Sequence, residues 1–178
     1  MRGTPGGKRF NLSAMKALYL LRHAKSSWKE AGLQDFDRPL NNRGREAAPL
    51  VGRLIRKEKL RIDLLLSSPA VRARQTAALV KEAAGLSAEL LYDERIYEAD
   101  ADALLEVVRQ VAESADALML VGHNPGMEEL LKLLTGEDEQ MPTAALACIS
   151  LDVEKWGKVR AGAGRLEWLV RPKELAGD

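Results

Sequence analysis

The sequence is poor in the residues that form cross-links or hold metals. Its 178 residues include one cysteine and two histidines. A single cysteine excludes a disulfide framework within the chain, which fits a reducing compartment such as the cytoplasm. Cys148 lies in the apolar run 145–149, so we expect a buried and unreactive thiol. Two histidines without a convincing third ligand disfavour a metal site, and we expect no metal and no cofactor.

A strong net charge and long apolar runs are also missing. The formal net charge is +1, so no basic field indicates a nucleic-acid partner or an anionic membrane. No apolar stretch approaches the roughly 20 residues that span a bilayer. The polar start of the chain lacks the apolar core of a secretion signal. We therefore expect a cytoplasmic protein without nucleic-acid or membrane partners, and leave its oligomeric state open. Residues 1–15 are expected to form a flexible N-terminal arm, in which Met15 is an alternative start.

Apolar runs and helical spacing alternate along the rest of the chain. The composition, 46% hydrophobic and 30% charged, is typical of a soluble globular protein, and the length fits one domain over residues 16–178. The alternation predicts an α/β fold, whose last two strands need not run parallel to the others. Strands are expected at 17–21, 62–66, 90–92, 117–121, 144–151 and 165–170, and helices at about 47–55, 70–84, 104–111 and 127–134.

Two prolines bear on where helices begin. Pro49 is tolerated cheaply only in the first turn of a helix, so the first helix either begins near Ala47 or is kinked at the proline. Pro125 suits the first position of the fourth helix, and Asn124 suits the residue that caps it.

Both histidines follow the end of a predicted strand. His23 follows Arg22 after the first strand, and His123 follows the fourth. In open α/β sheets, ligands bind beyond the carboxyl ends of the strands, so both imidazoles are expected to face one cleft. Arg72 lies just inside the helix after another strand, where the helix N-terminus favours anions. Two arginines and two imidazoles that converge predict an oxyanion pocket, and a phosphoryl group is the obvious occupant.

The chemistry of these groups suits phosphoryl transfer. A neutral imidazole such as His23 is a competent nucleophile toward phosphorus. Arg22 is able to hold phosphoryl oxygens with charge-assisted hydrogen bonds, and Ser26 to add a hydroxyl donor. His123 is expected to donate to the transferring group. Structural interpretations stay open: either histidine could be satisfied at a strand end or in the core, and Arg72 could pair with an acid.

Three motifs in this order resemble the histidine phosphatase (phosphoglycerate mutase-like) superfamily. They read LLRHAKS at 20–26, SSPAVRARQTA at 67–77 and VGHNP at 121–125. The segment DRPLNNRG at 37–44 resembles the SixA-type phosphohistidine phosphatase branch. The resemblance covers roughly residues 16–150 of the chain.

The resemblance implies a three-layer α/β/α fold with a mixed, mostly parallel sheet. It further implies a phosphohistidine intermediate on His23 and no metal requirement. Arg22, Arg72 and His123 would then form the phosphate pocket, with Ser26 at the position of the family's phosphate-contacting serine.

The motifs leave the identity of the proton donor open. The stretch 93–97 resembles the segment that carries an acidic donor in the mutases, which makes Glu94 a tentative general acid and Glu98 its competitor. An exposed loop carboxylate is an equally good interpretation of either. A phosphorylated imidazole carries its own protonatable nitrogen, so that leaving group needs an acid least.

The favoured function is a metal-independent phosphatase that acts on protein phosphohistidine or on small phosphoesters. The chain is short for a mutase, and an open cleft suits a phosphorylated side chain of another protein. A mutase or small-metabolite phosphatase and a non-catalytic phosphate-binding module are the alternatives.

The long loop 24–42 is expected to be functional because loops of this length are uncommon in compact domains. Lys25 and Trp28 have no assigned role. Arg38 either reaches the phosphate or, as we favour, pairs with Asp35 or Asp37.

Overall fold

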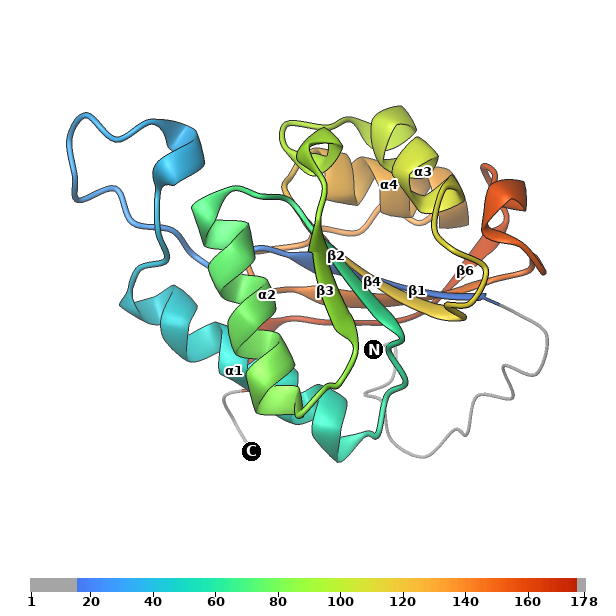
Figure 1. Cartoon of the computed structure of the whole chain (residues 1–178), viewed down its shortest axis with the longest axis horizontal. Coiled ribbons are helices and arrows are strands. Elements are labelled where there is room, and N and C mark those ends of the chain that lie inside the picture. Colours follow the sequence, from blue (N-terminus) through green and yellow to red (C-terminus); the bar gives the residue numbers. More distant parts are fainter. Residues whose placement is uncertain (1–15, 176–178) are drawn as a thin grey trace.

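The computed structural model describes residues 16–175, and the predicted N-terminal arm with Met15 lies outside the described residues. A six-stranded sheet with the order β3-β2-β4-β1-β5-β6 forms the centre of the molecule (Figure 1). Its strands are β1 (Lys16–Arg22), β2 (Leu64–Ser67), β3 (Glu89–Tyr92), β4 (Ala117–Gly122), β5 (Leu146–Leu151) and β6 (Gly164–Val170).

The sheet is mixed and mostly parallel, which confirms the predicted fold class. Strands β3, β2, β4 and β1 run parallel, whereas β5 runs antiparallel to β1 and β6 antiparallel to β5. The register pairs Arg22 of β1 with Gly122 of β4. Each of these two residues is followed by a histidine. The strand register alone therefore places His23 and His123 side by side at the carboxyl ends of β1 and β4.

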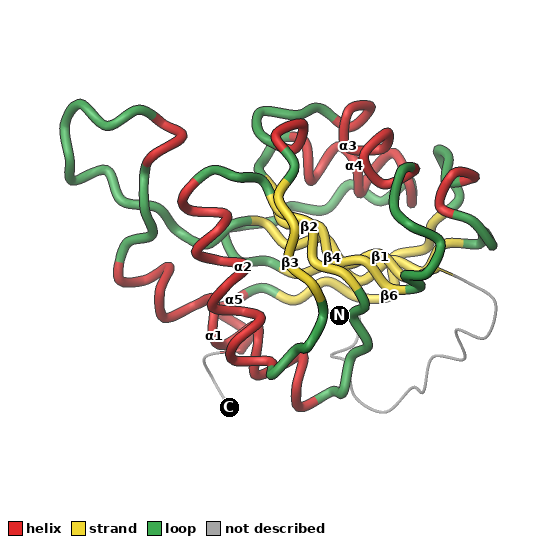
Figure 2. Tube along the Cα trace, in the orientation of Figure 1, coloured by secondary structure: helices red, strands yellow, loops and turns green. Residues whose placement is uncertain are grey.

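Helices cover both faces of the sheet (Figure 2). One apolar core joins α1, α2 and α5 to one face, and a second core joins α3 and α4 to the other. No helix within residues 16–175 is long and apolar enough to cross a membrane. The helices are α1 (Asn42–Lys57), α2 (Val71–Ala84), α3 (Ala101–Arg109), α4 (Gly126–Thr135) and α5 (Pro172–Leu175), with short 3₁₀ turns η1 (Asp35–Asp37), η2 (Glu94–Ile96) and η3 (Trp156–Lys158).

Helix α1 begins at Asn42, so of the two alternatives for this helix the start near Ala47 is wrong. The Asn41 side chain caps the helix by accepting a hydrogen bond of 2.9 Å from the Gly44 amide. The first turn is polar and gives no apolar periodicity, which is why the sequence pattern missed it. Pro49 consequently lies inside the helix.

Helix α4 begins at Gly126, with Pro125 in the capping position. The predictions that Pro125 is the first helical residue and that Asn124 caps the helix are wrong, because Pro125 takes the capping position and the Asn124 side-chain oxygen accepts no hydrogen bond among the described residues. The amide nitrogen of Asn124 acts as a donor instead. It donates to Glu128 Oε1 at 2.7 Å and to the carbonyl oxygen of Met141 at 3.1 Å.

Gly44 lets the first turn of α1 pack directly on the chain that follows β1. A Cβ atom at this position would lie 2.3 Å from the carbonyl oxygen of Lys25. Any larger residue would therefore push α1 away from the segment that carries His23.

Candidate active site

The imidazole rings of His23 and His123 lie side by side at the carboxyl ends of β1 and β4. Their centroids are 5.1 Å apart and their planes are inclined by 50°. Each residue is only 8% exposed. The structure therefore brings together the two histidines that the sequence placed at strand ends.

His23 is a neutral imidazole with an available lone pair. Its Nδ1 atom lies 2.7 Å from the carbonyl oxygen of Ala24. Because a carbonyl only accepts, Nδ1 carries the proton and Nε2 is unprotonated. Burial, assisted by the positive charges of Arg72 and Arg22, lowers the pKa of His23 to about 4 against the opposing effect of the Ala24 bond. The nucleophilic form therefore persists well below neutral pH.

His123 links Ser68 to Arg72. Its Nε2 atom is 2.7 Å from Ser68 Oγ, and its Nδ1 atom is 3.3 Å from Arg72 Nη2. A guanidinium group only donates, so Nδ1 accepts and Nε2–H donates to the serine. Burial and the adjacent His23 lower the pKa of His123 to about 3. Arg72 therefore sets the proton position on this ring, and Ser68, which the sequence analysis did not select, accepts from the protonated Nε2.

Arg72 is buried at the start of α2 and pairs with Asp35. Its Nη1 atom donates to the Asp35 carbonyl oxygen at 2.5 Å, and its Nη2 atom to Oδ2 at 2.8 Å. Thr76 ties this turn to the nucleophile, since its hydroxyl donates to the Arg72 carbonyl and accepts from the Ala24 amide. The pairing with an acid that the sequence left open is present, and it joins residues 37 positions apart.

Arg22 has a buried donor without an acceptor. Its Nη1 atom donates to the Met141 carbonyl oxygen at 2.9 Å, whereas Nε has no hydrogen-bond partner within residues 16–175. Burial lowers the pKa of this guanidinium group. An unsatisfied buried N–H costs about 1–3 kcal/mol, so the position favours a ligand with acceptor oxygens.

Ser26 and Arg38 form one unit with Asp35. Arg38 Nη2 donates to Ser26 Oγ at 2.7 Å, and Nη1 donates to Asp35 Oδ1 at 3.0 Å. The pairing of Arg38 with Asp35 that we favoured is confirmed. The Arg38 guanidinium also stacks 3.2 Å from the ring centroid of Trp28, a residue 81% exposed on the projecting loop. Lys25 is exposed.

Asp35 and Tyr97 are functional candidates that the sequence analysis missed. The Tyr97 hydroxyl donates to Asp35 Oδ2 at 2.9 Å, and its ring meets the His123 ring edge-on at 5.5 Å. Burial works to raise the pKa of Asp35, but hydrogen bonds from Arg72, Tyr97 and Arg38 together lower it. The only sequence signal for Asp35 was its place in an unusually long loop beside arginine.

Glu94 and Glu98 are exposed, on either side of Tyr97. No hydrogen bond among the described residues joins either carboxylate to the two histidines, Arg22 or Arg72. The segment suggested for the proton donor does reach the site, but through Tyr97. A proton-donor role for Glu94 stays a prediction.

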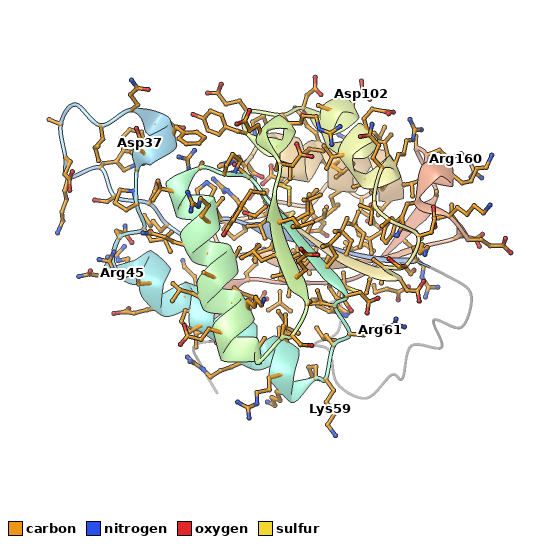
Figure 3. All side chains as sticks on the ribbon, in the orientation of Figure 1. Asp37, Arg45, Lys59, Arg61, Asp102 and Arg160 are labelled. Atoms are coloured by element: carbon orange, nitrogen blue, oxygen red, sulfur yellow. The ribbon has the colours of Figure 1, made fainter. Side chains whose placement is uncertain are left out.

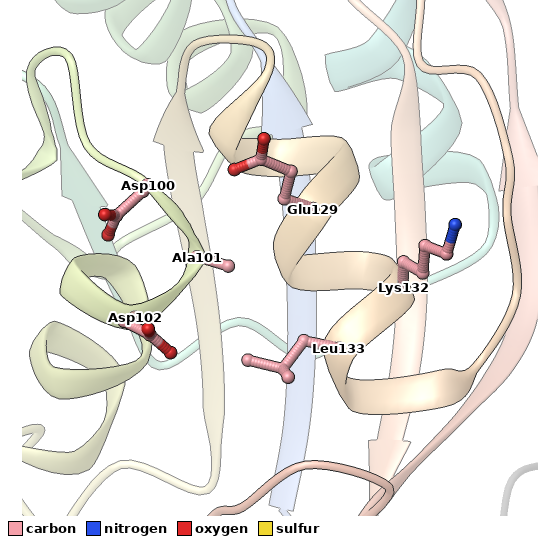
Figure 4. Close-up of a pocket in the computed structure, with 6 residues that line it drawn as sticks. All are labelled: Asp100, Ala101, Asp102, Glu129, Lys132 and Leu133. Carbon is pink, nitrogen blue, oxygen red and sulfur yellow. The ribbon is translucent and has the colours of Figure 1, made fainter.

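A hollow of about 400 Å³ lies between α3 and α4, away from the two histidines (Figure 4). Its polar lining is mostly acidic and would repel a phosphoryl group. The lining residues of the hollow are Asp100, Ala101, Asp102, Glu129, Lys132 and Leu133.

No cluster of histidine, cysteine or carboxylate side chains in the described part of the chain is arranged to hold a metal ion.

The fold and the paired histidines define an α/β protein that gathers two imidazoles and the Arg72 guanidinium at the carboxyl ends of its parallel strands. The chain matches the model of the histidine phosphatase superfamily, branch 1, over residues 18–113, more than half of its length. It is 34% identical over 157 residues to an uncharacterized protein of Mycobacterium tuberculosis, which covers 82% of this chain and 96% of the relative. The chain belongs to the histidine phosphatase superfamily.

Two further similarities point to one branch of this superfamily. The chain is 27% identical over 168 residues to the phosphohistidine phosphatase SixA of Escherichia coli, which covers 89% of this chain and 95% of the relative. A crystal structure from Agrobacterium tumefaciens, described as a “putative phosphohistidine phosphatase SixA”, is 34% identical. It superposes with a TM-score of 0.77 over 88% of this chain and 98% of its own.

Proposed function

We propose that this protein is a metal-independent phosphatase that removes a phosphoryl group from phosphohistidine by way of a phosphohistidine intermediate on His23. The observation that carries the proposal is the state of this ring, which is neutral, buried and protonated at Nδ1. Its Nε2 lone pair is thereby available to attack phosphorus. Membership of the histidine phosphatase superfamily supports the same assignment.

The reaction proceeds in two displacements. The Nε2 lone pair forms a bond to phosphorus, and the bond to the leaving nitrogen breaks with its electron pair going to that nitrogen. Water then attacks the phosphorus of the intermediate. Its oxygen remains on the phosphate with one of its protons, the other proton passes to solvent, and the bond to Nε2 breaks with the electron pair returning to His23.

The surrounding donors stabilise the phosphoryl oxygens. A guanidinium group has five N–H donors, and Arg72 uses three for Asp35 and His123, so two remain for a ligand. Arg22 contributes its unpaired Nε–H. When the Ser68 hydroxyl rotates and donates to Nε2, the ring proton of His123 lies on Nδ1. Nδ1 then donates to the phosphoryl group and no longer accepts from Arg72, so a third Arg72 N–H becomes free for the ligand. Ser26 Oγ accepts from Arg38, which stays paired with Asp35, so the Ser26 hydroxyl proton is free to be donated to a phosphoryl oxygen.

The substrate is a phosphorylated histidine on another protein. The named SixA relatives support this choice, as does a site whose rim is open enough to leave Asp35 half exposed. We place the protein in the cytoplasm because its single cysteine is buried and unpaired. Residues 16–178 act as one domain built on the single sheet.

The test is turnover of a phosphohistidine peptide by wild type and by His23→Ala, with a chelator present. The variant should be inactive, and acid-labile phosphate should accumulate on the wild-type chain alone. Lys25→Ala, an exposed change two residues away, is the matched control and should stay active. Undiminished turnover by His23→Ala would refute the mechanism. Far higher turnover of phosphoglycerate would select a small-metabolite enzyme, and phosphate binding without hydrolysis a non-catalytic module.

A further inference from the structure

Exposure changes sharply across the site and shows where the leaving group must lie. Arg72 is 6% exposed and the two histidines 8%, whereas the Asp35 side chain is 48% exposed. A substrate that enters phosphoryl group first therefore has its leaving group at the level of Asp35.

The Asp35 carboxylate keeps its negative charge at this level. Three donors hold it, namely Arg72 at 2.8 Å, Tyr97 at 2.9 Å and Arg38 at 3.0 Å. These bonds come from three different parts of the chain, so the carboxylate is fixed in position. A carboxylate only accepts hydrogen bonds, so a leaving group that carries its own carboxylate finds no donor in Asp35 and is repelled by its charge, although the charges of Arg72 and Arg38 oppose that repulsion.

Aromatic rings stand beside this carboxylate. Phe36 and Tyr97 pack edge-on with their centroids 5.1 Å apart, and both are partly exposed. Aromatic faces attract cations, and a carboxylate attracts them more strongly. The combination favours a planar ring that carries a positive charge.

We propose that Asp35, Phe36 and Tyr97 form the leaving-group subsite and select a protonated imidazole over an acidic phosphoester. The proposal rests on the proposed phosphatase function. The imidazole ring of a phosphohistidine is cationic when its second nitrogen is protonated. When the phosphorus–nitrogen bond breaks, the ring takes the electron pair and leaves as neutral imidazole with that proton retained. Asp35 holds the ring in the cationic form from which departure is easiest.

The experiment compares two substrates in wild type and Asp35→Asn. Phosphoimidazole carries the imidazole leaving group, and 3-phosphoglycerate carries a carboxylate. The asparagine oxygen is able to accept from Arg72 and Tyr97 as Oδ2 does, so the position of Arg72 is kept while the charge is removed. The amide nitrogen is a donor in place of Oδ1, so the bond from Arg38 is lost. We expect kcat/KM for phosphoimidazole to fall about tenfold, which is the size of effect that one charge pair near the surface produces. We expect kcat/KM for 3-phosphoglycerate to rise.

Asp37→Asn is the matched control. This exposed carboxylate lies on the same 3₁₀ turn, and Figure 3 shows it on the projecting loop. The control should leave the ratio of the two kcat/KM values unchanged. Tyr97→Leu is an independent variant that should lower kcat/KM for phosphoimidazole more than that for 3-phosphoglycerate.

Three other outcomes would count against the inference, each for a different reason. Equal losses on both substrates in Asp35→Asn would overturn the inference, because they would show that Asp35 only positions Arg72. Equal ratio changes in Asp35→Asn and Asp37→Asn would overturn it as well, since the cause would then be general surface charge. Absence of wild-type turnover on both compounds and on a phosphohistidine peptide would instead refute the proposed function, and the inference with it.

Discussion

His23 and His123 are held by strand register and burial, whereas Asp35 and Tyr97 are held by side-chain hydrogen bonds between loops. The histidines extend paired positions of β1 and β4 and are nearly inaccessible. Asp35 lies on the segment that projects from the body of the molecule in Figure 1, and half of its side chain meets solvent.

This difference separates chemistry from selectivity. The sheet fixes the nucleophile and its immediate partners, so these groups keep their geometry whatever substrate arrives. The loops set the charge and shape that the leaving group meets. Changes in the buried part should therefore affect all substrates alike, whereas changes at the rim should alter the preference among substrates.

The largest expected effect is that of Arg72→Ala in the buried part. Loss of one preorganised donor to the developing charge lowers kcat by about 10²–10³-fold. The loss should be similar for phosphoimidazole and for 3-phosphoglycerate. Arg74→Ala, an exposed change on the same helix, is the control and should retain activity. If Arg72→Ala lowered kcat for only one of the two substrates, the buried part of the site would also set substrate preference, and the proposed separation from the rim would be wrong.

The pH dependence of stability also separates the two regions. Folding lowers the pKa of His23 to about 4 and that of His123 to about 3, from 6.5. Between pH 4 and 6.5 the unfolded chain binds more protons, so the free energy of unfolding falls as the pH is lowered. At pH 5 each histidine should cost about 2 kcal/mol of stability. Denaturant unfolding at pH 7.5 and pH 5 measures this.

Two variants test whether the histidines cause this pH dependence of stability. His123→Gln should lose about half of the pH dependence. Asp35→Asn should keep it, because the pKa of that carboxylate is lowered by folding and its contribution is lost only below pH 5. An undiminished slope in His123→Gln would show that other groups cause the acid sensitivity.

The sequence predicted the buried part of the site well for a physical reason. Strand ends are visible as apolar runs, and the parallel register then places His23 and His123 together without any side-chain detail. Asp35 could not be predicted in the same way, because its position depends on how a loop of many residues folds back over α2. The capping of α1 was hidden similarly, since Asn41 acts through one side-chain bond and its first turn has no apolar pattern.

Ser68→Ala should have a smaller effect than Arg72→Ala. It tests whether Ser68 belongs to the buried part of the site or to the rim. Ser68 touches His123 and lies just beyond the strand pair β2–β4, so it supports a group in the buried part. Loss of a group that orients a functional histidine costs about 10–100-fold in metal sites, and we expect about tenfold in kcat here. The loss should be equal for both substrates. Ser27→Ala, on the loop, is the control; a substrate-dependent loss in Ser68→Ala would assign Ser68 to the rim.

The smallest expected effect is that of Glu94→Gln. A positioned general acid contributes about 10²–10⁴-fold, but the exposed Glu94 carboxylate has no hydrogen bond to the site in the described chain. A leaving imidazole that carries its own proton gains little from an added acid, so kcat on phosphoimidazole should change by less than about twofold. Glu98→Gln is the comparison, because Glu98 is equally exposed and lies next to Tyr97. A loss of a hundredfold in Glu94→Gln alone would make this loop carboxylate the proton donor, and the rim would then supply chemistry as well as selectivity.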